Sequence, residues 1–196
     1  MEIFGFGAGE VHVGDDGAVE QVVDPRGRQV LLDEDTLHAW GKGFVITDRG
    51  RQDFDQPVLQ RWRQSGIDLL YQPGELEMRV GRRFGDLWTE TYELRNAGVE
   101  PIDVSSIAIS TPFRERHWTG GTDPWVWAAP TSGPGLGLQL KEGKRWVSSV
   151  QSQEPGRLYL HVSDHARTLV PGASYRWTWQ LSWYDDLPAF QADSVR

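Results

Sequence analysis

The sequence predicts an all-β fold, an antiparallel β-sandwich with at most one or two short helices. Apolar and polar residues alternate with a period of two in many short segments, and glycine, proline and aspartate separate these segments at short intervals. Such alternation is typical of strands with one buried and one solvated face, and strands this numerous favour a sandwich. Residues 1–184 are expected to form a single domain, and residues 185–196 a polar tail or a linker to a further C-terminal domain.

The individual elements follow from this pattern. A hairpin is predicted within EVHVGDDGAVEQVVD (residues 10–24), with its turn at Asp15-Asp16-Gly17. A short helix is predicted around Asp33–Trp40, with Asp33 or Asp35 as its N-cap. Further strands are expected at Gln29–Leu32, Phe44–Thr47, Val58–Arg63, Ile67–Tyr71, Leu76–Val80, Leu87–Arg95, Ile102–Thr111, Trp125–Ala128, Leu136–Leu140, Trp146–Val150, Leu158–Val162 and Tyr175–Tyr184.

The last of these segments, YRWTWQLSWY, places aromatic residues and a leucine on one face of a strand and mostly polar residues on the other. If all of these indoles were exposed, they would form a larger apolar patch than soluble monomers usually tolerate. We therefore interpret this face as the floor of the core. An indole at one end of the row, Trp177 or Trp183, is the exception that could reach a surface groove.

The composition excludes several classes of function. The formal net charge of −8, without a basic stripe along the sequence, argues against nucleic acid and membrane surfaces as partners. The chain has no cysteine, which excludes disulfides, thiolate nucleophiles and cysteine zinc sites. No phosphate-binding loop, nucleophile elbow or metal signature occurs, so neither a cofactor nor a metal is expected.

The amino-terminal segment lacks a basic region followed by a long apolar run, and no segment approaches the ~18 apolar residues of a membrane span. A soluble protein is expected, with the cytoplasm as the default compartment. A secreted protein whose leader has been removed would have the same sequence features.

The segment Thr111–Pro134 departs from the alternation and combines charged side chains with three tryptophans among glycine and proline residues. Long loops in sandwiches commonly carry function, and an indole beside charged groups suits the apolar face and the hydroxyls of a sugar. The candidate substrate-binding residues are Arg114, Arg116, His117, Trp118, Asp123, Trp125 and Trp127. The alternative interpretation is that Trp125 and Trp127 both point into the core and that Arg114–His117 is a solvated turn.

No catalytic residue is assigned. His161 and His165 lie four residues apart, but no helix is predicted there that would bring them onto one face as metal ligands. Glu90 shares a strand face with Trp88 and Tyr92, and an edge position or a buried partner explains it better than a role as general base.

Two segments, Trp88–Phe113 and His117–Trp146, together resemble the N-terminal β-supersandwich domain of bacterial proteins of the six-hairpin glycosidase type. In these proteins a galactose-mutarotase-like sandwich precedes an (α/α)6 barrel. The resemblance rests on the turn Leu94–Pro101, Thr111-Pro112-Phe113, His117-Trp118, the glycine-rich Gly135–Gly143 and the closing strand Tyr175–Tyr184. This chain has Arg114-Glu115 where the relatives continue with Asn-Asp.

The resemblance implies an accessory domain of a carbohydrate-active, glycoside hydrolase-like protein, with carbohydrate and a C-terminal helical domain of the same natural chain as its partners. The catalytic acids of such proteins lie mostly in the barrel, which this chain lacks, so we expect no hydrolysis by the chain alone. The alternatives are a stand-alone carbohydrate-binding module, a purely structural role, and a mutarotase- or epimerase-like enzyme. The last would use His117, His161 and Glu115 as acid and base.

Overall fold

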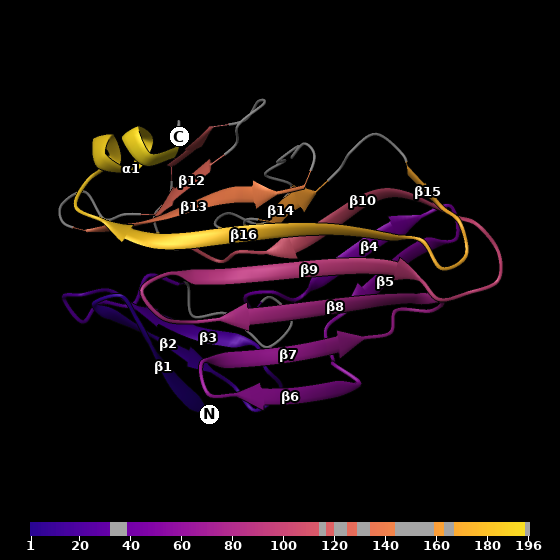
Figure 1. The fold of residues 1–196 in the computed structure, drawn as a ribbon, viewed down its shortest axis with the longest axis horizontal. Helices are drawn as coiled ribbons and strands as arrows, with labels where there is room; N and C mark the ends of the chain where they lie inside the picture. Colours follow the sequence, from indigo (N-terminus) through magenta and orange to yellow (C-terminus); the bar gives the residue numbers. More distant parts are fainter. Residues whose placement is uncertain are drawn as a thin grey trace.

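The computed structural model describes residues 1–31, 39–113, 117–119, 125–128, 134–143, 159–162 and 167–194. Within these residues the strands form three antiparallel sheets (Figure 1). The all-β sandwich that the sequence predicts is therefore confirmed. Among the described residues, no helix is long and apolar enough to cross a bilayer.

The largest sheet has eight strands in the order β11-β12-β13-β16-β9-β8-β7-β6 and is called the large sheet below. Its strands are β6 (Leu59–Arg63), β7 (Gly66–Tyr71), β8 (Leu76–Arg83), β9 (Trp88–Asn96), β11 (His117–Thr119), β12 (Trp125–Ala128), β13 (Gly135–Glu142) and β16 (Ser174–Tyr184). In Figure 1, β16, β9, β8, β7 and β6 run side by side across the molecule.

Two smaller sheets complete the sandwich. One contains β1 (Glu2–Phe6), β2 (Gly9–Val13) and β3 (Val19–Val23). The other contains β4 (Gly43–Thr47), β5 (Gly50–Phe54), β10 (Ile102–Ser110), β14 (Tyr159–Val162) and β15 (Arg167–Leu169).

Both smaller sheets pack against the same face of the large sheet, which we call its inner face. Phe6 of β1 meets Trp88 of β9 edge to face, with ring centroids 5.9 Å apart. Phe54 of β5 meets Tyr71 of β7 in the same way, at 5.8 Å. The core thus lies between the inner face and the two smaller sheets, and the opposite, outer face of the large sheet is left for other contacts.

The aromatic stripe of β16 confirms its predicted place in the core. Trp177, Trp179 and Leu181 are fully buried on the inner face, and Trp177 stacks on Tyr92 with ring centroids 5.2 Å apart. Trp183, at the end of the row, is only partly buried and donates its indole N–H to the carbonyl of Phe6 at 3.0 Å. Trp177 therefore does not reach a surface groove, and the indole of Trp183 is bonded to β1 through its N–H group.

Most predicted strands appear, and the predicted hairpin is β2–β3. Four strands were not predicted. In β1 and β5, charged and glycine residues weaken the alternation, and β11 and β15 have only three residues each. Of the predicted strand Gln29–Leu32, the described part makes only isolated bridges to Val23 and Phe113. The predicted strand Trp146–Val150 and most of the predicted helix Asp33–Trp40 lie outside the described residues.

Part of the expected polar tail forms helix α1 (Leu187–Ser194). Asp186 caps it by accepting a hydrogen bond from the backbone N–H of Ala189 at 2.8 Å, and Pro188 in the first turn needs no intrahelical donor. Phe190 is its fully buried residue, and Leu187 packs beside it. Tyr184 of β16 also donates a hydrogen bond to Asp193 at 2.6 Å, so the helix is attached to the sandwich by apolar and polar contacts.

Candidate functional site

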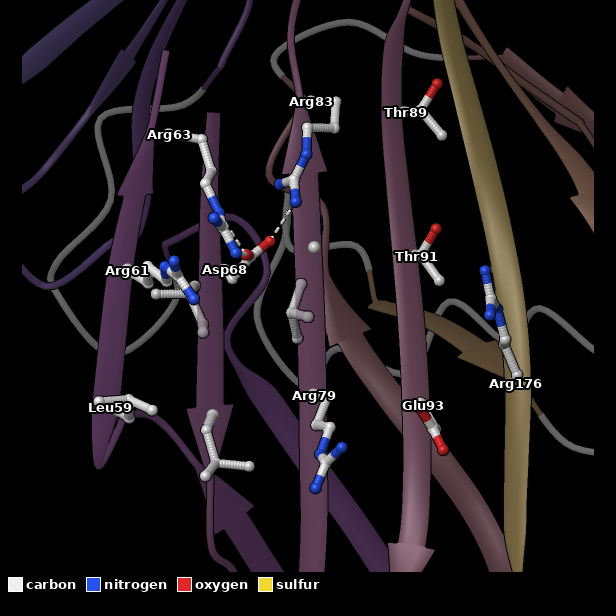
Figure 2. A pocket seen from close by; sticks show the side chains of 14 residues that line it. Leu59, Arg61, Arg63, Asp68, Arg79, Arg83, Thr89, Thr91, Glu93 and Arg176 are labelled. Atoms are coloured by element: carbon white, nitrogen blue, oxygen red, sulfur yellow. Dashed lines mark hydrogen bonds and ion pairs between the residues drawn. The ribbon is translucent and has the colours of Figure 1, made fainter. Parts of the chain in front are cut away.

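The outer face of the large sheet carries a groove of about 580 Å³ that crosses β6, β7, β8, β9 and β16. Its lining residues are Leu59, Arg61, Arg63, Asp68, Leu69, Leu70, Arg79, Val80, Gly81, Arg83, Thr89, Thr91, Glu93 and Arg176. We call it the arginine groove (Figure 2). Strand alternation explains its polar floor, because on β9 the residues between the buried Trp88, Glu90 and Tyr92 point outward.

The strand register arranges the groove residues in rows. Arg61 pairs with Asp68, Asp68 with Gly81, and Gly81 with Thr91 across four neighbouring strands. Directly paired residues share a face and lie close enough to interact. One row of the groove therefore begins with a guanidinium, passes a carboxylate and a glycine, and ends with a hydroxyl.

Asp68 is the anionic centre of the groove. Arg63 approaches it from one side at 2.7 Å and Arg83 from the other, and Figure 2 shows both guanidinium groups converging on its carboxylate. Burial by itself raises the pKa of Asp68, but the hydrogen bonds and charges of Arg83 and Arg63 outweigh it and hold the pKa below its ordinary value. Asp68 is therefore ionised at neutral pH and cannot act as a general acid there.

A second row places Glu93 between Arg79 of β8 and Arg176 of β16, as the register and Figure 2 both show. Arg79 also bonds Glu77 at 3.1 Å, and Arg176 lies 3.6 Å from Glu142. These two arginines thus have carboxylate neighbours outside the groove as well.

The lining contains five arginines and two carboxylates, in a chain whose net charge is −8. Arg61 makes no hydrogen bond or ion pair with any residue in the described part of the chain. The sequence shows no basic stripe because the groove arginines come from three strands: Arg61 and Arg63 from β6, Arg79 and Arg83 from β8, and Arg176 from β16. The sequence analysis therefore missed this site, and the signal that could have found it is arginine at alternate, outward positions of LQRWR and MRVGRR.

The predicted site lies at the other end of the same face. Trp125 and Trp127 of β12 both contact Phe190 of α1, with ring centroids 5.5 and 5.7 Å apart. Tyr184 closes the cluster at 5.1 Å from Phe190. Gly137 makes room for Phe190, since a Cβ at that position would overlap its ring.

The structure places Trp125 and Trp127 in a second, smaller hydrophobic cluster. They do share a strand face, but it is the outer face, and α1 covers it. Val126 and Ala128 occupy the inner face and belong to the main core. Trp127 is buried, as the core interpretation predicts, and Trp125 is half-buried, but both lie in the cluster under α1 and not between the sheets.

The remaining candidates are only partly placed. Arg114, Arg116 and Asp123 lie outside the described residues. His117 and Trp118 belong to β11, whose backbone pairs with Trp127 and Val126 at the edge of the large sheet. Their role in binding stays a prediction.

The structure does not bring the proposed acid and base histidines into one sheet. His161 lies in β14, which pairs with β10, whereas His117 lies in β11 of the large sheet. Glu115, their proposed companion, lies outside the described residues. In the part of the chain that the structure describes, no group of acidic and histidine side chains could hold a metal ion.

Glu90 has the buried partner that was expected. Its carboxylate accepts hydrogen bonds from Arg82 Nε at 2.7 Å, Trp40 Nε1 at 3.0 Å and Tyr92 Oη at 2.7 Å. All four side chains are fully buried. Glu90 is therefore a structural residue that no substrate can reach.

The fold has known counterparts. No protein-family model matches the sequence, and no curated protein does. Among solved structures, a polysaccharide lyase is similar with a TM-score of 0.80 and 20% identity, over 97% of this chain and 34% of the lyase. This chain therefore spans about a third of the lyase.

Other similar structures have lower scores. A GH36 α-galactosidase of Geobacillus stearothermophilus has a TM-score of 0.60 and 10% identity, over 94% of this chain and 40% of the galactosidase. A galactose mutarotase-related enzyme from Lactobacillus acidophilus has a TM-score of 0.56 and 8% identity, over 94% of this chain and 97% of that enzyme. Identities this low establish the fold alone: the chain has the galactose-mutarotase-like β-supersandwich fold that its resemblance to the N-terminal domains of six-hairpin glycosidase-type proteins predicts.

Proposed function

We propose that the chain is an accessory domain of a larger carbohydrate-active protein and binds carbohydrate on the outer face of the large sheet. In this proposal it packs against a helical catalytic domain and lends the segment Arg114–Trp127 to a sugar groove. The observation that carries the proposal is the match of nearly the whole chain, 97%, to only 34% of a polysaccharide lyase. A module that recurs as one part of a larger enzyme is expected to support that enzyme's work on its substrate.

The outer face offers suitable chemistry for such a role. The arginine groove supplies guanidinium and hydroxyl groups, and its volume of about 580 Å³ lies within the ~300–1,000 Å³ of ordinary ligand sites. The aromatic residues Trp125 and Tyr184 lie at the far end of the same face. A glycan lying along this face would meet polar groups at one end and indoles at the other.

The described residues of the groove do not form a catalytic set. Asp68 is engaged by two arginines, and Glu93 lies between Arg79 and Arg176. Neither carboxylate is placed against a histidine in the groove lining. We therefore expect binding without turnover.

The test is to titrate the purified 196-residue chain with a panel of neutral and acidic oligosaccharides and to assay the same panel for cleavage. Binding without cleavage is the expected result. Trp125→Ala should weaken binding, because Trp125 is a half-buried indole on the outer face. Trp62→Ala, on the edge strand β6, serves as its control, and the thermal unfolding temperature checks that both variants stay folded. Robust cleavage, or no binding to any saccharide, would overturn the proposal.

A second candidate, an aldose epimerase- or mutarotase-like enzyme, is favoured by one observation. The chain spans 97% of the mutarotase-related enzyme, so the fold also occurs as a protein of about this size. Polarimetry with glucose and galactose tests this candidate directly. We expect no acceleration of mutarotation, and an acceleration lost in His117→Ala would establish the enzyme instead.

A further inference from the structure

We propose that the arginine groove binds an acidic saccharide, with a carboxylate or sulfate group of the sugar seated at Arg61. The inference rests on the proposed carbohydrate function and names the class of carbohydrate. The juxtaposition that carries it is one row of the groove. Arg61, which has no partner among the described residues, begins this row, and Asp68, Gly81 and Thr91 continue it.

The charge of the groove is opposite to that of the chain. Five arginines face two carboxylates there, whereas acidic residues exceed basic ones by eight over the whole sequence. Asp68 is shared by two guanidinium groups, so it balances only one of them. Glu93 lies between Arg79 and Arg176 but forms no ion pair with any described residue. Glu77 lies beside Arg79 and Glu142 beside Arg176, so the arginine without a counter-charge among the described residues is Arg61, and a ligand anion can balance it there.

Arg61 is the best placed of the five to hold that anion. It is exposed, and it forms no ion pair or hydrogen bond within the described ranges of the chain. Figure 2 shows it beside the Asp68 cluster, at the β6 side of the groove. A guanidinium presents paired donors that match the two oxygens of a carboxylate or sulfate.

The floor of the groove is low because of Gly81. A Cβ at this position would lie 3.6 Å from Asp68 Oδ1 and 4.0 Å from Arg83 Nη1, which is ordinary contact. Neither packing nor backbone conformation therefore demands glycine here. Thr91, its partner on β9, and Thr89 beside it offer hydroxyl groups to the hydroxyls of a sugar.

The shape and composition favour a saccharide over an acidic protein surface. Protein interfaces are depleted of aspartate relative to the rest of the surface, whereas this hollow carries Asp68 in its lining. Leu59 and Leu70 border the groove and suit the C–H face of a sugar ring.

Isothermal titration of the whole chain tests the inference with four probes: tetragalacturonate, a sulfated galactan oligosaccharide, the matching neutral galactan oligosaccharide and polyglutamate. At least one acidic saccharide should bind at least about tenfold more tightly than the neutral one and than polyglutamate. The first two probes show whether a carboxylate or a sulfate is recognised. Affinity should fall with added salt because exposed charges are screened.

Three variants locate the site. Arg61→Gln should weaken acidic binding by about tenfold or more, because it removes a charge-assisted hydrogen bond. Gly81→Val should weaken it similarly by filling the floor, although it leaves every charge in place. Arg26→Gln, which removes an exposed arginine from the turn after β3, should change the affinity by less than about twofold. The thermal unfolding temperature of each variant checks that the fold is intact.

The outcomes separate this inference from the proposed function. Equal binding of neutral and acidic sugars would overturn the inference and leave the carbohydrate function standing. Equal binding of polyglutamate would show a polyanion or protein surface instead of a saccharide site. Acidic binding unchanged in both groove variants would place the site elsewhere, and no binding of any saccharide would overturn both proposals.

Discussion

Arg82 and Glu90 form an ion pair that is fully enclosed by the core, with Arg82 Nε 2.7 Å from Glu90 Oε1. The two residues are direct cross-strand partners on β8 and β9. Arg82 also donates to the carbonyl of Gly17, and Trp40 donates to Glu90 at 3.0 Å. Burial by itself lowers the pKa of Arg82, but the charge of Glu90 outweighs it and raises the pKa, so the guanidinium stays charged. It joins the large sheet to the β2–β3 turn and to the segment before β4.

Breaking this pair should be costly. Glu90→Gln leaves the guanidinium of Arg82 buried without a counter-charge, and removal of one member of a buried pair costs about 3–5 kcal/mol. The double variant Arg82→Met with Glu90→Leu should recover part of that loss, because it buries no charge. Urea unfolding of the single and double variants measures both values. A loss below about 1 kcal/mol for Glu90→Gln would contradict the role assigned to the pair.

Two glycines should respond in opposite ways to alanine. Gly41 has φ +83°, and a Cβ there would overlap the guanidinium of Arg82, so Gly41→Ala should cost more than about 2 kcal/mol. Gly81 has ordinary strand geometry with room for a Cβ, so Gly81→Ala should be neutral or stabilising by about 0.5 kcal/mol. Chemical unfolding of the two variants side by side checks the contrast. Equal losses would contradict the packing described for Arg82.

Phe190→Ala should release α1 from the outer face. The phenylalanine ring contacts both tryptophans of β12, and its removal leaves an eight-residue helix held by the partly buried Leu187 and by the Tyr184–Asp193 hydrogen bond. We expect faster hydrogen exchange over α1 and a red shift of the tryptophan emission as Trp125 becomes exposed. Gln191→Ala, an exposed position of the same helix, is the control and should change neither signal. An unchanged emission in Phe190→Ala would show that the aromatic cluster does not depend on α1.

Asp24 should contribute to stability in a pH-dependent way. Its buried carboxylate accepts hydrogen bonds from the backbone of Arg26 at 2.8 Å and of Arg28 at 2.9 Å, and from Arg28 Nε at 2.8 Å. Burial alone raises the pKa of Asp24, but these bonds and the charge of Arg28 hold it below its ordinary value. Since the folded pKa is depressed, the stabilisation is complete above about pH 4 and is lost as the pH falls through the folded value.

The comparison of wild type with Asp24→Asn isolates this contribution. Wild type should be the more stable of the two at neutral pH, and the difference should shrink as the pH falls below about 4. Thermal unfolding of both proteins across this range measures the effect. A difference that stays constant with pH would contradict it.

The sequence predicted the strands best where one face is buried and the other solvated. In β9 and β16 the alternation is almost complete, so the inward direction of Trp179 and Leu181, and the face that Glu90 shares with Trp88 and Tyr92, followed from the pattern. The edge strands β1 and β5 escaped prediction because their burial is uneven. Helix α1 escaped it because a single buried phenylalanine makes no amphipathic pattern.

The groove could not be predicted in the same way. Arg61, Asp68 and Gly81 lie on three different strands, and only the register of those strands puts them in one row. The candidate residues in Arg114–Trp127 are close in sequence, and such residues can form a site in one loop. Residues of a site that spans several strands are far apart in sequence, so the pattern that indicates this groove is limited to arginines at alternate positions of single strands.

The sequence by itself determined the fold class and the inward face of each long strand, and it placed Glu90 on an aromatic face, at an edge or beside a buried partner. These properties depend on the alternation of side chains along one strand, which is a local property of the sequence. Only the tertiary structure decided that the partner is Arg82, that α1 covers Trp125 and Trp127, and that arginines gather in a groove. Those contacts depend on which strands become neighbours and in what register, and that choice is made by the free energy of packing the whole chain.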